Sequence, residues 1–306
     1  MSSHATTSGS QRVSALPTAR LRLPEGWTAQ VMLRDAQGNV IDAHAWRVGL
    51  AGASDLFARA DRVLKQDGDR WVIAVDLALA ERRLQVVAKH HVYPGDLAGI
   101  VRSLLPGRAM RNFQTACTLI RAGVPVTWPL AALERAGPHG QRESLFITER
   151  IAGAVDLHAW VQQWTAGQRD VTPAARRTLA RRLGETFARL DRAGLWHRDA
   201  KAGNFLVAEG TDGPAVYLVD LDGVRSRPPW ATHATHRGPA KLAATLIWAG
   251  SITTTDAWRA VHASARAGNR NVDKAMVRSL YHHAVAERLA TFIMAARAAT
   301  GDKERP

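Results

Sequence analysis

The chain has 306 residues, of which 46% are hydrophobic and 22% charged, values typical of a soluble globular protein with one large domain or two lobes. A single cysteine, Cys117, excludes an internal disulfide framework, and no run approaches the roughly 18 apolar residues of a transmembrane helix. The formal net charge of +14 favours an anionic partner such as nucleic acid, membrane headgroups or a phosphorylated substrate.

The N-terminal stretch MSSHATTSGSQR is polar and lacks the apolar segment of a secretory signal. We therefore predict a disordered tail over residues 1–20. Because we find neither a signal nor a membrane span, we expect a cytoplasmic protein. Peripheral contact with the cytoplasmic face of the inner membrane is compatible with this expectation.

Apolar runs in the first third of the chain predict strands. Residues 28–34 and 39–47 flank Gln37-Gly38, a dipeptide that suits a hairpin turn. Two further apolar runs, residues 71–79 and 83–91, are bounded by polar residues and also read as strands.

Helical spacing becomes clear further along the chain. It predicts a helix at about 108–121, and a strand follows at 144–151. The clearest helix covers 172–194, where Thr172 suits the N-cap and Pro173 the first turn. Four arginines of this helix lie outside its apolar stripe and predict a solvated face in preference to an anion site: Arg176, Arg177, Arg181 and Arg182.

A β-hairpin follows this helix, with FLVA at 205–208 and AVYLVDLD at 215–222 joined by the turn EGTDGP. Residues from about 238 to 297 are rich in Ala, Leu and Arg and should be helical. This order of elements predicts an α+β fold of two lobes. The small, mainly antiparallel β lobe would cover 21–148, including the first helix, and the larger helical lobe 149–306.

Four polar residues occur in the order that protein kinases use. Lys89 ends the apolar run VVA, and Asp199 is followed by Asn204 in the spacing H-R-D-x-x-x-x-N. Asp220 then ends the run VYLV. Phosphoryl transfer from ATP needs such a set: a cation for the phosphates, an amide and a carboxylate for Mg²⁺, and a carboxylate for the acceptor hydroxyl. Each piece alone is a weak signal, but their order and spacing together favour a kinase over chance.

The segments that carry this set resemble a known family. WHRDAKAGNFLV at 196–207 and LVDLDG at 218–223 are similar to the lipopolysaccharide kinase (Kdo/WaaP) family, within the protein-kinase-like superfamily. RAGVPV at 121–126 and FITE at 146–149 resemble its segments before and at the hinge. The resemblance extends over about residues 60–250. It implies a protein-kinase-like two-lobed fold, ATP and Mg²⁺ as cofactors, and a sugar hydroxyl of the lipopolysaccharide inner core as acceptor.

The resemblance places a catalytic loop at 197–204. It implies that Asp199 orients and deprotonates the acceptor hydroxyl and that Asn204 holds Mg²⁺. Lys201 would neutralise the γ-phosphate; the alternative is a solvated loop lysine.

A metal-binding segment is implied at 220–223, where Asp220 would be the second Mg²⁺ ligand. The residues that follow are Leu221-Asp222, not the Phe-Gly of protein kinases. Asp222 is either a further metal ligand or a structural hydrogen-bond acceptor.

Nucleotide contacts are implied for the first lobe and the hinge. Lys89 would contact the phosphates, and the backbone of Glu149 and Ile151 would meet adenine, although ordinary strand roles explain these two residues equally. The glycine-rich loop of kinases is missing, since residues 64–70 contain one glycine. That residue, Gly68, serves either a hairpin turn or phosphate cover.

Two departures from protein kinases bear on function. No Ala-Pro-Glu follows Asp222, and its absence favours a sugar or lipid acceptor over a peptide. The helix at 108–121 has no glutamate to pair with Lys89, which keeps a pseudokinase that only binds a partner as one alternative. A serine/threonine protein kinase is the other.

The expected partner is an anionic glycolipid or sugar substrate. The basic residues do not interleave with aromatic ones as a stacking platform for bases requires, so no nucleic acid is expected.

Overall fold

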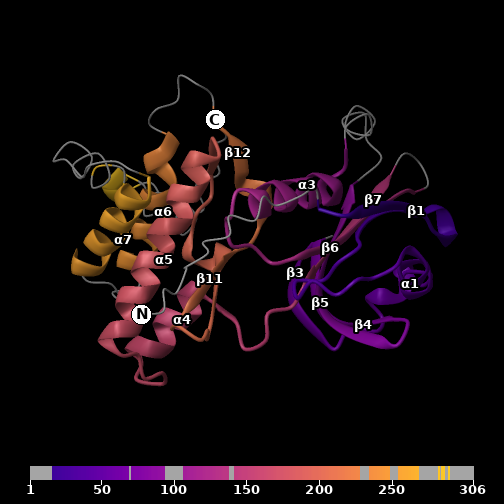
Figure 1. The fold of residues 1–306 in the computed structure, drawn as a ribbon, viewed down its shortest axis with the longest axis horizontal. Coiled ribbons are helices and arrows are strands. Elements are labelled where there is room, and N and C mark those ends of the chain that lie inside the picture. Colours follow the sequence, from indigo (N-terminus) through magenta and orange to yellow (C-terminus); the bar gives the residue numbers. More distant parts are fainter. Residues whose placement is uncertain are drawn as a thin grey trace, which may run out of the picture. The chain divides into compact units, whose positions relative to one another are not determined.

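The computed structural model describes residues 16–68, 70–93, 106–137, 141–227, 234–248, 254–268, 282, 284–286 and 289 (Figure 1). The chain divides into two units. Unit 1 comprises Met1–Met110 and Pro129–Ile147, and unit 2 comprises Arg111–Trp128 and Thr148–Pro306. Much of the helical region predicted for 238–297 lies outside the described residues.

Unit 1 is built on a seven-stranded sheet with the order β1-β2-β6-β7-β5-β4-β3. Its pairs β1–β2, β2–β6, β3–β4 and β4–β5 are antiparallel. The strands are β1 (Thr18–Arg22), β2 (Thr28–Met32), β3 (Arg62–Asp67), β4 (Arg70–Leu79), β5 (Arg82–Tyr93), β6 (Pro129–Ala136) and β7 (Arg142–Glu149). The unit also contains two 3-10 turns, η1 (Pro24–Gly26) and η2 (Ala53–Leu56).

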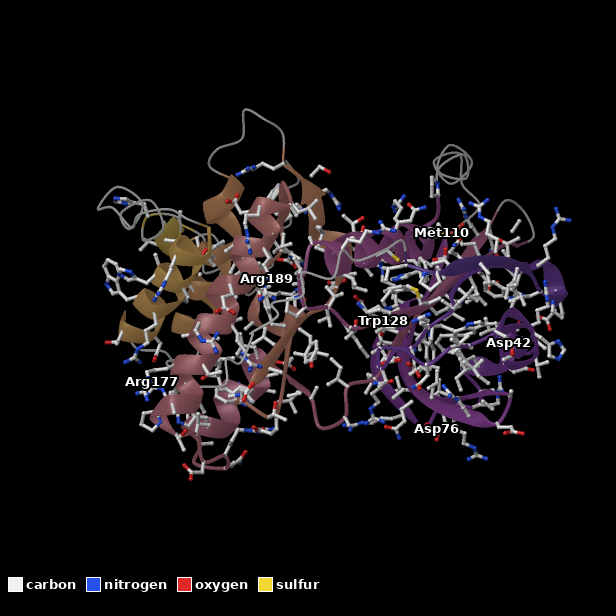
Figure 2. All side chains as sticks on the ribbon, viewed as in Figure 1. Asp42, Asp76, Met110, Trp128, Arg177 and Arg189 are labelled. Atoms are coloured by element: carbon white, nitrogen blue, oxygen red, sulfur yellow. The ribbon has the colours of Figure 1, made fainter. Side chains whose placement is uncertain are left out.

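The strands form where side chains alternate between core and solvent. Along β4, Val75, Leu77 and Leu79 are buried while Asp76 between them is exposed (Figure 2). Because successive side chains of a strand point to opposite faces, this alternation gives the sheet one apolar face. The strands predicted at 71–79 and 83–91 are confirmed as β4 and β5.

The strand predicted at 39–47 is wrong, because helix α1 (Ala43–Gly49) forms there. The Asp42 carboxylate accepts the N–H of Ala45 at 2.8 Å and so caps the helix. Trp46 is fully buried, and its Nε1 donates to the carbonyl oxygen of Met32 at 2.8 Å. A turn at Gly38, with φ of +86°, is present as expected.

Three further findings differ from the sequence analysis. The predicted tail over 1–20 is too long, because β1 begins at Thr18 and pairs with β2; residues 1–15 lie outside the described residues. Strand β6 was not predicted.

Helix α3 (Arg108–Arg121) forms as predicted, but residues 111–128 group with unit 2 and not with the predicted β lobe. The segment after this helix is joined to unit 2 by a hydrogen bond, in which the Pro125 carbonyl accepts the N–H of Leu218 at 2.8 Å.

Unit 2 combines helices with two small sheets. Its elements are β8 (Val155–Asp156), α4 (Leu157–Thr165), α5 (Pro173–Arg192), β9 (Leu195–His197), η4 (Ala202–Asn204), β10 (Phe205–Ala208), β11 (Ala215–Leu218), η5 (Leu221–Gly223), β12 (Val224–Ser226), α6 (Ala234–Trp248) and α7 (Thr254–Ala267). The sheets have the orders β11-β10-β8 and β12-β9. The predicted hairpin of β10 and β11 is confirmed.

Helix α5 lies at the centre of unit 2 and has its predicted cap, since Thr172 Oγ1 accepts the N–H of Ala175 at 3.1 Å. The predicted solvated arginine face is partly wrong. Arg177 is exposed (Figure 2), but Arg176 pairs with Asp256 of α7 and lies 4.3 Å above the Trp164 ring. None of the helices in the described residues is both long and apolar enough to cross a bilayer.

Candidate active site

Two antiparallel strand pairs bring the predicted catalytic loop and metal segment together in unit 2. Phe205 of β10 pairs with Leu218 of β11, so the residues just outside this pair also meet: Val219 N–H donates to the Asn204 carbonyl at 2.9 Å. At the other end, β9 pairs with β12, and Arg198 N–H donates to the Gly223 carbonyl at 2.8 Å. Both loops are therefore fixed at both ends.

His197 links the two loops from a buried position, with 1% of its surface exposed. Its Nδ1 accepts the backbone N–H of Asp199 at 3.1 Å, and its Nε2 lies 3.2 Å from the Asp220 carbonyl oxygen. An acceptor at Nδ1 requires the proton on Nε2, which then donates to Asp220. Burial lowers the pKa of His197, in agreement with this neutral form.

The Asp199 carboxylate lies between two ammonium groups. Lys241 Nζ is 2.7 Å from Oδ1, and Lys201 Nζ is 3.3 Å from Oδ2. Burial alone would raise the pKa of Asp199, but the hydrogen bond and charge of Lys241, followed by those of Lys201, bring this pKa below its ordinary value. The carboxylate is therefore ionised at neutral pH, and 36% of the side chain remains exposed.

Lys241 was not predicted as part of this site. It lies on α6, far along the chain from the H-R-D motif, in a helix rich in alanine. A lysine in such a helix carries no pattern that distinguishes it from a solvated residue. Only the three-dimensional structure brings it to Asp199.

Asn204 and Asp220 present two oxygen donors in neighbouring loops. Asn204 is buried, and its Nδ2 donates to the Asp199 carbonyl at 2.6 Å, so its Oδ1 is the amide atom left to meet a cation. Asp220 has a left-handed backbone with φ of 58° and ψ of 59°, a conformation that Asp and Asn adopt more readily than most residues.

Such a donor set is compatible with Mg²⁺, which prefers hard oxygen ligands and keeps several sites for water and phosphate. Within the described residues, no group of three or more His, Cys, Asp or Glu side chains could hold a metal. A protein cage for a cation is thus not found in this part of the chain. The Asp222 carbonyl accepts from Arg225 at 2.7 Å, and both roles considered for its carboxylate remain open.

The predicted nucleotide residues fall in both units. Lys89 is half-buried in β5, opposite Val72 of β4, and it shares a strand face with His91. Burial lowers the pKa of His91 to about 3, assisted by nearby cations that include Lys89. Several cations therefore lie near this part of β5. Gly68 forms the turn between β3 and β4 with φ of +54°, where a glycine avoids strain.

Glu149 and Ile151 lie in unit 2 at the end of β7 and just after it. The N–H of Glu149 donates to the Trp128 carbonyl at 2.9 Å, so this N–H is not the group that adenine would meet. The Ile151 carbonyl accepts the N–H of Ala154 at 3.3 Å.

The sequence model of the lipopolysaccharide kinase (Kdo/WaaP) family matches residues 77–263. This range is more than half of the chain and contains both the predicted set and Lys241. The chain belongs to this family. The predicted family and enzyme class, a phosphotransferase, are thereby confirmed, and the kinase class implies the use of ATP.

Curated relatives carry two different names. A 3-deoxy-D-manno-octulosonic acid kinase of Vibrio parahaemolyticus is 24% identical over 208 residues, covering 66% of this chain and 76% of that protein. The lipopolysaccharide core heptose(I) kinase WaaP of Pseudomonas aeruginosa is 31% identical over 125 residues, or 39% of this chain and 45% of that protein. A 3-deoxy-D-manno-octulosonic acid kinase of Actinobacillus succinogenes is 30% identical over 153 residues, or 47% of this chain and 60% of that protein. The match thus spans less than two thirds of the length of the Pseudomonas and Actinobacillus proteins.

A solved structure of a family member supports the fold. The structure described as "WaaP in complex with acyl carrier protein" is 21% identical, matches with a TM-score of 0.57, and covers 81% of this chain and 98% of that one. The likeness confirms the predicted α+β fold of protein-kinase type.

Proposed function

We propose that this kinase transfers the γ-phosphate of ATP to a sugar hydroxyl of a lipopolysaccharide inner-core-like acceptor, with Asp199 as the base. The observation that carries the proposal is the state of Asp199. Its carboxylate is ionised and partly exposed, and its backbone N–H is linked through the His197 ring to the Asp220 carbonyl oxygen. A carboxylate in this state can accept the proton of a hydroxyl.

Other residues would manage the charge of the nucleotide. Asn204 and Asp220 would hold Mg²⁺, which when bound neutralises the phosphates and orients them. Lys201 would leave Asp199 for the γ-phosphate, and this is easier because its side chain is 51% exposed and its ion pair is the longer of the two. Lys89 would contact the α- and β-phosphates from β5.

Two further assignments concern the adenine and the cover over the phosphates. Gly68 lies in a hairpin turn where a backbone N–H would approach phosphate without a side chain in the way. The backbone of Glu149 and Ile151 would border adenine, with the Glu149 N–H already donated to Trp128.

The acceptor would be an anionic glycolipid. The relatives are named as kinases of 3-deoxy-D-manno-octulosonic acid and of a core heptose, and both names point to a sugar hydroxyl. A net charge of +14 favours binding to an anionic lipid at the cytoplasmic face of the inner membrane. The cytoplasmic location and the peripheral membrane contact are part of the proposal.

Labelled phosphate transfer tests this function. The purified chain, Mg²⁺ and [γ-³²P]ATP are incubated separately with an octulosonic-acid-terminated lipid A, a dephosphorylated heptose-bearing core lipid, and a protein extract. We expect label in one of the two lipids. Label in the protein fraction alone indicates a protein kinase and contradicts the proposal.

Nucleotide binding provides the control. Mg-ATP should raise the melting temperature of the chain. A raised melting temperature with no label in either lipid rejects these acceptors. An unchanged melting temperature favours a pseudokinase that only binds a partner.

A further inference from the structure

Lys241 contacts Asp199 from a helix outside the catalytic loop. Its Nζ lies 2.7 Å from Oδ1 of Asp199, a shorter contact than the 3.3 Å between Lys201 Nζ and Oδ2. Its side chain is also less exposed, 31% against 51%. Of the two cations, Lys241 is therefore held more firmly against the carboxylate.

One face of α6 is fixed against the catalytic loop on both sides of Lys241. Three residues before it, Gly238 packs beside the loop: an added Cβ would lie 3.1 Å from the Phe187 ring and in ordinary contact, at 3.5 Å, with the His197 carbonyl oxygen. Four residues after it, Thr245 Oγ1 accepts the backbone N–H of Ala202 at 3.2 Å. Residues at these spacings share a helix face, so the backbone of α6 aims Lys241 at Asp199.

We propose that Lys241 is a positioning residue that holds Oδ1 of Asp199 and thereby presents Oδ2 to the acceptor hydroxyl. This inference rests on the proposed function. When Lys201 moves to the γ-phosphate, Lys241 is the ammonium that keeps the carboxylate in place. The acceptor oxygen then bonds to the γ-phosphorus as the bond from phosphorus to ADP breaks. The proton of the hydroxyl passes to Oδ2.

The test compares Lys241→Met, Lys241→Arg and the control Arg181→Met, which removes a cation from the exposed side of α5. Turnover is measured with Mg-ATP and the lipid that accepts label. We expect Lys241→Met to lower kcat about 10- to 100-fold, the scale of a misplaced catalytic group, with KM for ATP unchanged. Lys241→Arg should restore most of the lost kcat, and Arg181→Met should match the parent chain.

Two outcomes separate the inference from the function. If Asp199→Ala is inactive while Lys241→Met keeps the parent kcat, the positioning role is overturned and the proposed function stands. If Asp199→Ala keeps its turnover, the proposed function itself fails.

The melting temperature with and without Mg-ATP shows whether each variant is folded and binds nucleotide. If Lys241→Met does not fold, Lys241→Gln replaces it in the comparison. A folded Lys241→Gln with the parent kcat overturns the inference.

Discussion

The Nε2 atom of His197 lies 3.2 Å from the carbonyl oxygen of Asp220, while Nδ1 of the same ring accepts the N–H of Asp199 at 3.1 Å. One neutral imidazole thus joins the proposed base to the proposed metal ligand. The close contact with Gly223, where an added Cβ would lie 2.4 Å from the ring, fixes the ring in place.

His197→Ala should therefore reduce both stability and turnover. Removing the ring leaves the Asp220 carbonyl and the Asp199 N–H without this partner, at a cost of about 1–3 kcal/mol for a buried polar group. We expect a lower melting temperature and a lower kcat at temperatures where the variant is folded. Parent-like kcat in the folded variant would contradict the linking role.

Gly223→Ala tests the same contact from the other side. The added methyl group has no room beside the buried ring, so we expect a fall in kcat together with a small loss of stability. Gly52→Ala is the matched control, because its added Cβ would meet only ordinary contacts at 3.7 Å. Circular dichroism and turnover on the same preparations check both variants.

Acid should destabilise the chain through two histidines, the half-buried His91 and the buried His197. Burial lowers the folded-state pKa of His91 to about 3 and also lowers that of His197, relative to 6.5. The unfolded chain then binds more protons below pH 6.5, so the stabilisation is complete above this pH and is lost as pH falls toward 3. Each such histidine contributes up to about 1.4 kcal/mol per pH unit.

Melting temperatures from pH 7.5 to 4.5 measure this effect. The parent chain should lose stability progressively below about pH 6.5, the unshifted histidine value. His91→Gln should show a shallower decline over the same range. Equal slopes for parent and variant would mean that His91 is not held neutral in the folded chain.

Gly184→Ala should destabilise α5 although alanine favours helices by about 1 kcal/mol over glycine. The added Cβ would lie 2.2 Å from the carbonyl oxygen of Ala260 in α7. Because this neighbour is backbone, the two helices must separate, at a cost of about 1–3 kcal/mol. A chemical-denaturation midpoint at or above that of the parent would contradict this packing.

Asp220→Asn and Asn204→Ala should raise the Mg²⁺ concentration needed for half-maximal turnover, since each removes a proposed oxygen ligand. Asp222→Ala separates the two roles that remain open for that residue. A metal ligand predicts a raised Mg²⁺ requirement, and a structural acceptor predicts a lower melting temperature with the Mg²⁺ requirement unchanged.

Contacts between residues close together along the chain could be predicted from the sequence. The hairpin of β10 and β11 and the loop before it are contiguous, so their spacing alone brings Asn204 beside Val219. The strand predicted at 39–47 failed because an apolar run of that length also fits a helix, and Asp42 supplies the cap that decides between them.

Long-range contacts were not accessible in this way. Strand β6 has the sequence PLAALERA, whose alanines, leucines and glutamate favour a helix, and pairing with β2 and β7 makes it a strand. Lys241 reaches Asp199 because α6 packs on the loop at Gly238 and bonds to it through Thr245. No pattern in the sequence encodes that approach.

The central claim is that Asp199 is the base for transfer to a sugar hydroxyl. Its most direct test is the rate of ³²P transfer from ATP to the accepting lipid by Asp199→Asn, which keeps the shape of the side chain and removes its charge. We predict a loss of about 10²- to 10⁴-fold in that rate, as for removal of a general base, with an unchanged thermal shift by Mg-ATP. Transfer at the parent rate would contradict the claim.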